Sequence, residues 1–195
     1  MGVGDTRAVY ELTRSLTLMG TRLEIAYSSR LEDRQLERDL ILLGGGDSNR
    51  IFSRIEESGR LQFRFQHGPL TLRDLSEGVE YRATFTEIDL SQASDVPLEG
   101  VNIFERDGRP VAGLIAADYG VLARMRNPYN PHRTLILIAG LYGYGTWGGA
   151  RLIGDREFMK RCSQLRAEEF ECLYKVEVLQ NMPVAVYPVI LRALH

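Results

Sequence analysis

The spacing of apolar residues at the start of the chain predicts an amphipathic helix. Over residues 6–19 they recur at roughly 3.6-residue intervals, Asp5 stands before them as an N-cap, and Gly20 follows them. A short stretch of strict apolar–polar alternation comes next, at residues 23–27, and is typical of a strand with one buried face. We therefore expect a helix and then a strand at the N-terminal end.

Two continuous apolar runs, at residues 40–43 and 134–139, predict strands that are covered on both faces. Each run leads into glycines and then into a helical pattern. The chain continues with a helix that Asp155 caps and with a final pair of strands, at residues 170–179 and 184–191. This order of helices and strands predicts an α/β fold.

The middle of the chain has the pattern of a β-rich segment. Alternating or short apolar stretches lie at residues 61–65, 81–85, 101–104, 111–115 and 119–126. Asp107-Gly108 is a strong hairpin signal between two of these stretches. We expect a single domain over residues 1–195, with a three-layer Rossmann-like sheet and an antiparallel β-rich insert or extension at about residues 61–117.

Composition and charge narrow the classes of function. Of the 195 residues, 44% are hydrophobic and 26% are charged, so one domain with an ordinary core is expected. The chain has 22 arginines and only 2 lysines, but its 24 basic residues face 26 acidic ones, so we expect no nucleic-acid partner. No apolar run approaches the roughly 20 residues of a membrane span, and no signal-peptide pattern opens the chain. We therefore expect a cytoplasmic protein without a membrane partner.

The cysteines and histidines give no sign of a metal site. Cys162 and Cys172 have no CxxC spacing, so we expect both thiols to be reduced and structural. His67, His132 and His195 are far apart in the sequence. We expect neither a metal nor a cofactor, and the ligand class that remains open is a nucleotide-like molecule bound by glycine-rich segments.

The first candidate site is the segment that follows the apolar run at residues 40–43. Its members combine three glycines with polar side chains: Gly44, Gly45, Gly46, Asp47, Ser48 and Asn49. Glycines at the carboxyl end of a strand let backbone N–H groups approach a ligand, and Ser48 and Asn49 can donate to its oxygens. The alternative is a glycine turn in which Asp47 or Ser48 caps the next helix.

The second candidate site is a literal G-x-G-x-x-G that follows the run at residues 134–139. The dinucleotide-binding fingerprint also needs an acidic residue at the end of the following strand, and here the acidic pair Glu168-Glu169 precedes that strand. Tyr144 and Trp147 are also bulkier than the usual residues of that fingerprint, which disfavours an NAD(P) site. The expected half-pocket facing the first segment consists of Gly143, Tyr144, Gly145 and Thr146. Aromatic packing over the sheet edge is the alternative.

A third group contains charged residues of the stretch at 118–126. Arg124 and Arg126 share one strand face, which suits an anion, so we add Arg124 to the expected ligand-binding residues; a solvated strand face is the alternative. Asp118, like Asp47, is a candidate general base if the chain is an enzyme. The sequence has no G-x-S-x-G, P-loop or H-E-x-x-H motif, so we expect no catalytic residue.

Short sequence motifs along almost the whole chain resemble those of an uncharacterised bacterial Rossmann-like domain. This domain is found alone or at the C-terminus of winged-helix and other signal-transduction proteins. The motifs are Gly4-Asp5 with Ala8 and Leu12, the strand-GG-x-x-x-N stretch that ends at Asn49, Asp118-Tyr119, and Gly140 through Gly145-Thr146. The resemblance implies a regulatory setting, with a protein partner or a fused effector or sensor domain. It also implies that the chain is a piece of a longer protein.

A looser resemblance concerns residues 145–150. This segment is similar to the part of nucleoside deoxyribosyltransferase-like and TIR-like folds where a glutamate acts at the ribosyl centre, and glycine stands where that glutamate is expected. We expect a non-catalytic ligand-sensing or regulatory domain that binds a small nucleotide-like or anionic molecule between the two glycine segments. The alternatives are an enzyme that processes nucleosides or NAD, and a protein-interaction module.

Overall fold

The computed structural model describes residues 2–45, 49–67, 70–89 and 100–194. Its helices are α1 (Val3–Leu18), the short 3-10 helix η1 (Ser28–Arg30), α2 (Asp33–Leu36), α3 (Arg50–Glu57), α4 (Gly143–Ile153) and α5 (Arg156–Gln164). Its strands are β1 (Leu40–Leu43), β2 (Phe63–His67), β3 (Leu70–Asp74), β4 (Glu80–Tyr81), β5 (Thr84–Glu87), β6 (Val101–Arg106), β7 (Arg109–Asn127), β8 (Asn130–Gly140), β9 (Phe170–Leu179) and β10 (Met182–Ala193).

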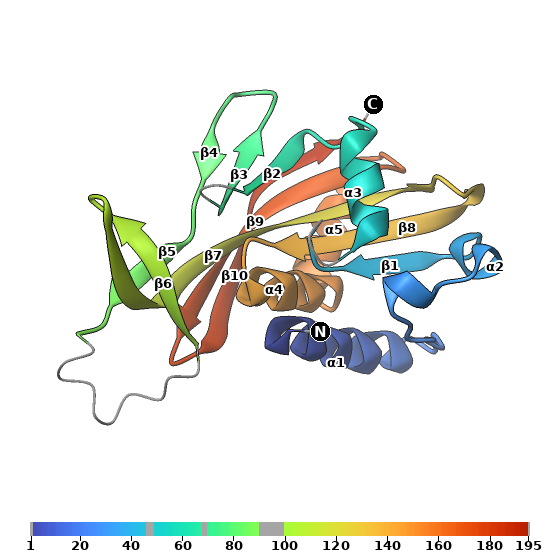
Figure 1. The fold of residues 1–195 in the computed structure, drawn as a ribbon. Coiled ribbons are helices and arrows are strands. Elements are labelled where there is room, and N and C mark those ends of the chain that lie inside the picture. The colour runs from blue at the N-terminus through green and yellow to red at the C-terminus, as the bar shows by residue number, and fades with distance from the viewer. Residues whose placement is uncertain (1, 46–48, 68–69, 90–99, 195) are drawn as a thin grey trace.

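The main sheet is built around β7, which runs for 19 residues. The C-terminal half of β7 pairs with β8 and β9, and the sheet continues outward to give the order β1-β8-β7-β9-β10. The N-terminal half pairs with β5 and β6, which form the arm at the left of Figure 1. Among the described strands, only the β1–β8 pair is parallel. The fold is therefore mixed α/β, with a 7-stranded mixed sheet and a 3-stranded antiparallel sheet of β2, β3 and β4.

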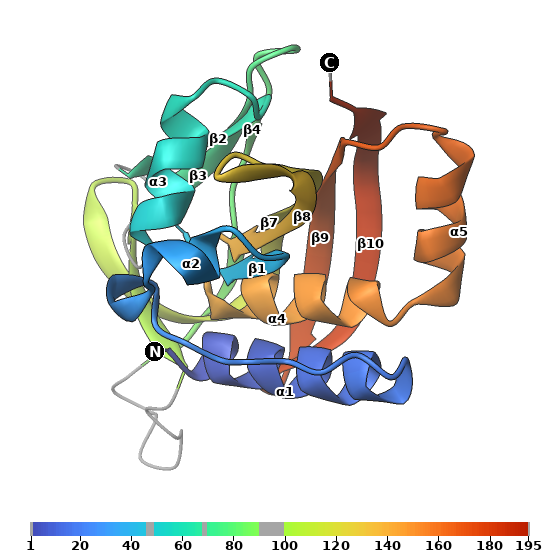
Figure 2. The same cartoon turned by 90° about the vertical axis from the view of Figure 1, so that its right-hand side faces the viewer.

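The two faces of the main sheet carry different layers. On one face, α4 lies against the strands and α1 lies beneath α4 as the outermost element (Figures 1 and 2). α5 packs on the same side, where Cys162 and Cys172 are buried free thiols, as predicted. Burial raises the pKa of Cys172 to about 12. On the other face, α3 and the small sheet form a second core with β1, β7 and β8. Within the described residues, no helix is both long and apolar enough to cross a membrane.

Two predictions about strands are corrected by the fold. Residues 111–115 and 119–126 belong to one continuous strand, so most of the β-rich segment extends the main sheet itself. The strand predicted at residues 23–27 is wrong, because this stretch pairs with no other strand. It is part of a linker along α1, which we call the 22–28 segment (Figure 2). In it, Ile25 and Tyr27 are 63% and 57% exposed.

An ion network joins the small sheet to the outer strands of the main sheet. Arg192 on β10 makes two hydrogen bonds of 3.0 Å to Asp74 on β3, and another of 2.6 Å to Glu171 on β9. Its guanidinium group also lies 4.2 Å from the ring centre of Phe63. Both carboxylates are fully buried. Burial raises the pKa of Glu171, whereas the pKa of Asp74 stays low because Arg192 and Ser76 outweigh the effect of burial.

Candidate functional site

The two glycine segments lie side by side at one edge of the main sheet. β1 and β8 are parallel neighbours, so their carboxyl ends meet at the same edge, and Leu43 pairs with Ile138. The backbone N–H of Gly44 donates to the carbonyl oxygen of Ile138 at 3.0 Å. Beyond β8 the chain turns directly into α4. The structure therefore brings the two predicted segments together.

Asn49 is a buried helix cap at the end of the first segment. Its side-chain oxygen accepts the backbone N–H groups of Ile51 at 3.1 Å and Phe52 at 3.4 Å, and its amide group donates to the carbonyl oxygen of Leu43. Asn49 thus joins the end of β1 to the start of α3, and takes the capping role that the sequence left to its neighbours. The other polar candidates of this segment and its third glycine lie outside the described residues: Gly46, Asp47 and Ser48.

The glycines of α4 allow the helix to pack closely against the sheet. A Cβ atom on Gly145 would lie 2.6 Å from the Cα of Gly140 and 2.7 Å from the carbonyl oxygen of Tyr119. A Cβ atom on Gly148 or Gly149 would collide with side chains of the strands. Gly145 and Gly148 of the G-x-G-x-x-G, together with Gly149 directly after it, therefore have a packing role, since each removes a side chain where the helix meets the sheet.

The remaining residues of the second segment also serve packing. Gly143 faces Gly4 where α1 crosses α4, and a Cβ atom on Gly143 would lie 3.1 Å from the Cα of Gly4. Tyr144 is partly buried and packs against the core between the helices and the sheet. The hydroxyl of buried Thr146 accepts the backbone N–H of Gly140 at 3.2 Å. The packing of Tyr144 fits the alternative of aromatic packing over the sheet edge.

Asp118 on β7 is the buried carboxylate that holds this edge together. It accepts the backbone N–H groups of Tyr119 at 2.8 Å, Tyr142 at 3.1 Å and Gly145 at 2.6 Å. The last two belong to the start of α4, whose N-cap residue, Tyr142, makes no side-chain cap of its own. Burial raises the pKa of Asp118 to about 7, although its three N–H donors favour the charged form. Asp118 therefore supplies from another strand the cap that α4 lacks.

The position of Asp118 argues against two roles at this edge of the sheet, namely catalysis by Asp118 and anion binding at the start of α4. Its side chain is 0% exposed and its oxygens are occupied by backbone donors, so it has no access to a substrate. When ionised it also places a negative charge at the N-terminus of α4, where an anionic ligand would otherwise bind. We therefore assign Asp118 a structural role, and we do not place an anion at the start of α4.

Arg124 lies away from the glycine edge. β7 pairs Gly120 with Gly140 at that edge, and Arg124 is four residues further along the strand, about 13 Å away. Its guanidinium group donates to the carbonyl oxygen of Glu168 at 2.8 Å, and neighbouring Arg126 forms an ion pair with the same glutamate. The structure does not bring Arg124 to the two glycine segments.

A cavity of about 400 Å³ lies beside the first glycine segment, between α1, the 22–28 segment and β1. α1 lines it with Asp5, Val9, Leu12 and Thr13, and β1 lines it with all four of its residues, 40–43. Of the described residues predicted to bind a ligand, only Asn49 lines this cavity. The cavity therefore opens on the α1 side of β1, instead of between the two glycine segments.

The cavity lies where β1 lacks a covering element. Leu42 is buried in the core on the α3 side of the sheet, whereas Ile41 and Leu43 are only partly buried and face the cavity side. The continuous apolar run at residues 40–43 predicts a strand covered on both faces. Ile41 and Leu43 contact the core on the side of α1 and α4, and the cavity beside them leaves part of each side chain uncovered.

The charged residues at the cavity are mostly engaged in ion pairs. Glu24 pairs with Arg38 at 3.1 Å, and Asp39 pairs with Arg133 at 3.4 Å. Arg22 is exposed and forms no ion pair with any residue in the described ranges. Among the described lining residues, Arg22 is therefore a cation that is available to a bound anionic group.

Sequence reasoning missed most of this cavity because its walls carry no motif. They come from one side of an ordinary helix and from a linker, and only the continuous apolar run of β1 gave a signal. Within the described part of the chain, no group of three or more His, Cys, Asp and Glu side chains could hold a metal ion. No family model, curated protein or solved structure matches the chain.

Proposed function

We propose that this chain is a non-catalytic ligand-binding domain with a regulatory role, and that its ligand occupies the cavity between α1, the 22–28 segment and β1. The observation that carries the proposal is the cavity itself, which leaves the apolar side chains Ile41 and Leu43 incompletely covered. Its volume of about 400 Å³ lies in the range of small-molecule sites. A bound molecule would complete the burial that the sequence of β1 requires.

The lining indicates the chemistry of the ligand. Val9, Leu12 and Ile41 offer apolar surface for the body of a small molecule, which includes the flat ring of a nucleotide-like compound. Arg22 offers a cation for a carboxylate, sulfonate or phosphate. Asp5 also lines the cavity, but its carboxylate accepts the backbone N–H of Gly2 at 3.3 Å at the start of α1, where the helix dipole favours it. We therefore propose an amphipathic anion.

We also propose a Rossmann-like assignment for the part of the sheet beside this cavity. β1 and β8 are parallel, and each continues through glycines into a helix at the same edge. Open α/β sheets bind ligands at the carboxyl ends of such strands, and Leu43 and Asn49 place the cavity next to that end of β1.

Two fluorescent probes with the same kind of apolar body test separately the apolar cavity and the contact of Arg22 with an anionic group. N-phenyl-1-naphthylamine is neutral, and 1-anilinonaphthalene-8-sulfonate carries one negative charge. We expect both to bind the folded protein, with the anionic probe roughly three- to tenfold tighter because of its contact with Arg22. Arg22→Gln should remove this preference and leave the neutral probe unaffected.

Variants that fill the cavity locate the bound probes. Val9→Trp and Ala26→Trp place a bulky side chain at the cavity wall from two different elements, and each should weaken both probes by about tenfold or more. Tyr10→Trp is the matched control, because this neighbour on α1 does not line the cavity. Probe affinity that is unchanged in both filling variants would contradict the proposal. A thermal-shift screen of nucleotides and carboxylates then identifies candidate natural ligands.

A further inference from the structure

A stripe of alternating apolar and cationic side chains runs along the outer side of α1. Its five members recur every three or four residues, and all are exposed: Val3, Arg7, Tyr10, Arg14 and Leu18. This spacing places them on one side of the helix, opposite Ala8 and Leu12, which are buried in the core shared with α4. The three apolar members are 69%, 64% and 81% exposed in chain order. We call these five residues the α1 stripe.

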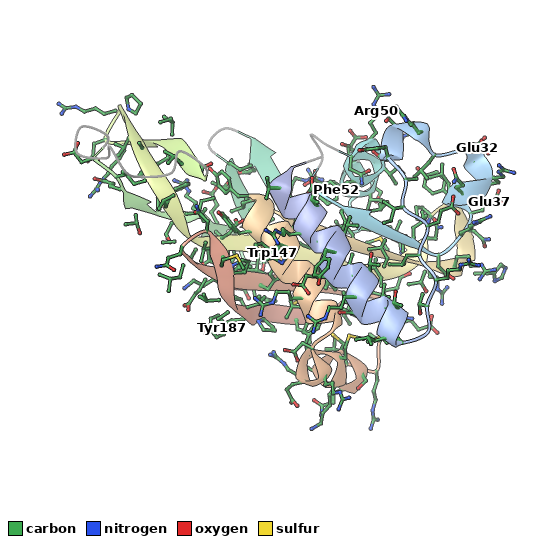
Figure 3. All side chains as sticks on the ribbon, turned by 90° about the horizontal axis from the view of Figure 1, so that it is seen from below. Glu32, Glu37, Arg50, Phe52, Trp147 and Tyr187 are labelled. Atoms are coloured by element: carbon green, nitrogen blue, oxygen red, sulfur yellow. The ribbon has the colours of Figure 1, made fainter. Side chains whose placement is uncertain are left out.

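The α1 stripe lies on the outer surface of the molecule. α4 separates α1 from the sheet, and α1 is nearest to the viewer in Figure 3. The neighbouring 22–28 segment adds the exposed side chains of Ile25 and Tyr27. Arg22 and Arg30 are exposed next to them in the sequence. Large apolar side chains gathered on one exposed face usually mark an interaction site.

The α1 stripe contains two arginines, Arg7 and Arg14, and no acidic residue. The guanidinium group of Arg7 also lies 5.5 Å from the ring centre of Trp147 on α4. The acidic residues of the same stretch are hydrogen-bonded or ion-paired. Glu11 accepts the indole N–H of Trp147 at 3.5 Å, Glu24 pairs with Arg38, and Asp5 accepts a backbone N–H. The partner of this face should therefore combine negative charge with an apolar interior.

We propose that the α1 stripe docks on the surface of a membrane that contains anionic lipids, which differs from the expectation from the sequence that the protein has no membrane partner. A convex helix with protruding apolar side chains inserts them at the boundary between head groups and acyl chains, while its arginines bind lipid phosphates. A protein partner would instead need a rigid complementary surface of about 800 Å² on each side. Lipids adapt to protruding side chains. None of the five residues of the α1 stripe lines the cavity, whereas Arg22, Ile25 and Tyr27 beside it do.

Vesicle flotation tests the proposal with the whole chain. Vesicles of phosphatidylcholine alone are compared with vesicles that contain roughly 30% phosphatidylglycerol, a common anionic lipid. We expect at least about tenfold stronger binding to the anionic vesicles, and loss of that binding in about 0.5 M salt because the charges are screened. Absence of binding to anionic vesicles at low salt, or equal binding to both kinds, would overturn the proposal.

Three double variants then locate the contact. Arg7→Gln with Arg14→Gln should weaken binding by roughly 25-fold, at about fivefold per arginine. Tyr10→Ser with Leu18→Ser should weaken it by about tenfold at unchanged net charge. Arg73→Gln with Arg109→Gln is the control, because it removes two exposed arginines from β3 and β7. Circular dichroism confirms that each variant is folded. An equal loss in the control, or no loss in the serine variant, would contradict docking through the α1 stripe.

Discussion

The carboxylate of Asp118 on β7 accepts the backbone N–H of Gly145, the third residue of α4, at 2.6 Å. This bond crosses from a strand to a helix that begins 25 residues later in the sequence. The same glycine lies so close to the sheet that a Cβ atom would be 3.1 Å from the carboxylate. The cap and the missing side chain therefore act together, because the carboxylate reaches the backbone only where no side chain intervenes.

Removing this cap should destabilise the protein more than removing an ordinary one. Asp118→Ala leaves backbone N–H groups at the start of α4 buried without an acceptor, so we expect a loss of about 2–4 kcal/mol in the free energy of unfolding at pH 6. Urea unfolding measures it. The control is Asp155→Ala, which removes the exposed cap of α5 and should cost about 1 kcal/mol. Equal losses would show that burial adds nothing to the role of Asp118.

Asp118 should also make stability fall as the pH rises. Burial raises the pKa of this carboxyl from 3.8 to about 7, so the folded protein holds the proton more tightly than the unfolded chain does. The resulting stabilisation is fully present below about pH 4 and is lost as the pH rises through about 7, for a change of about 4 kcal/mol. Asp118→Asn keeps the shape of the side chain without titrating. The stability of the parent protein minus that of this variant should therefore decrease between pH 4 and 8. Parallel pH curves would refute the raised pKa.

A methyl group at Gly149 should destabilise the fold even though alanine favours helices. Alanine gains about 1 kcal/mol over glycine in a helix. At this position its Cβ would lie 2.5 Å from Cγ2 of Ile138 and would also collide with the hydroxyl of Tyr174. We expect Gly149→Ala to lower the free energy of unfolding by at least about 2 kcal/mol, measured by thermal and urea unfolding. Gly45→Ala is the control, because no atom lies within 4 Å of its Cβ position, and it should stay within about 0.5 kcal/mol of the parent.

The ion network of Arg192 with Asp74 and Glu171 should contribute strongly to stability. Arg192→Gln leaves the buried carboxylates of Asp74 and Glu171 without a cation, so we expect a loss of about 3–5 kcal/mol in stability at pH 8. The loss should be smaller near pH 4.5, where protonation removes part of the uncompensated charge. The stability of Arg192→Lys should lie between that of the parent protein and that of Arg192→Gln, because an ammonium group keeps the charge but cannot bind Asp74 through two parallel bonds. A loss in Arg192→Gln that does not change with pH would argue against charge as its cause.

Local sequence patterns predicted those helices and strands that follow from the spacing of apolar residues within the element itself. The apolar period at residues 6–19 corresponds to α1, and the runs at 40–43 and 134–139 correspond to β1 and β8. The glycines that follow these runs also indicated correctly that both segments lie at one edge of the sheet, because parallel strands end at the same edge. The strand predicted from the alternation at residues 23–27 was wrong, because a strand also needs a partner strand and this stretch pairs with none.

The roles of the residues at the glycine edge could not be predicted, because they depend on contacts between distant parts of the chain. Glycine at positions 145, 148 and 149 is equally consistent with a ligand or a neighbouring strand at close range, since both require the absence of a Cβ atom. The sequence also left Asp118 open as a general base, because its partners at the start of α4 lie more than 20 residues away. Only the packed structure distinguishes a buried cap from an accessible carboxylate.

The sequence by itself determined the main helix and strand periods, the two glycine segments and the thoroughly apolar character of β1, all of which follow from neighbouring residues. The tertiary structure alone decided that α4 uses its glycines to reach the sheet, and that Asp118 caps this helix. It also decided that the cavity opens between α1 and β1. These features arise where separate elements meet, and the spacing of residues along one element does not encode the distance to the next.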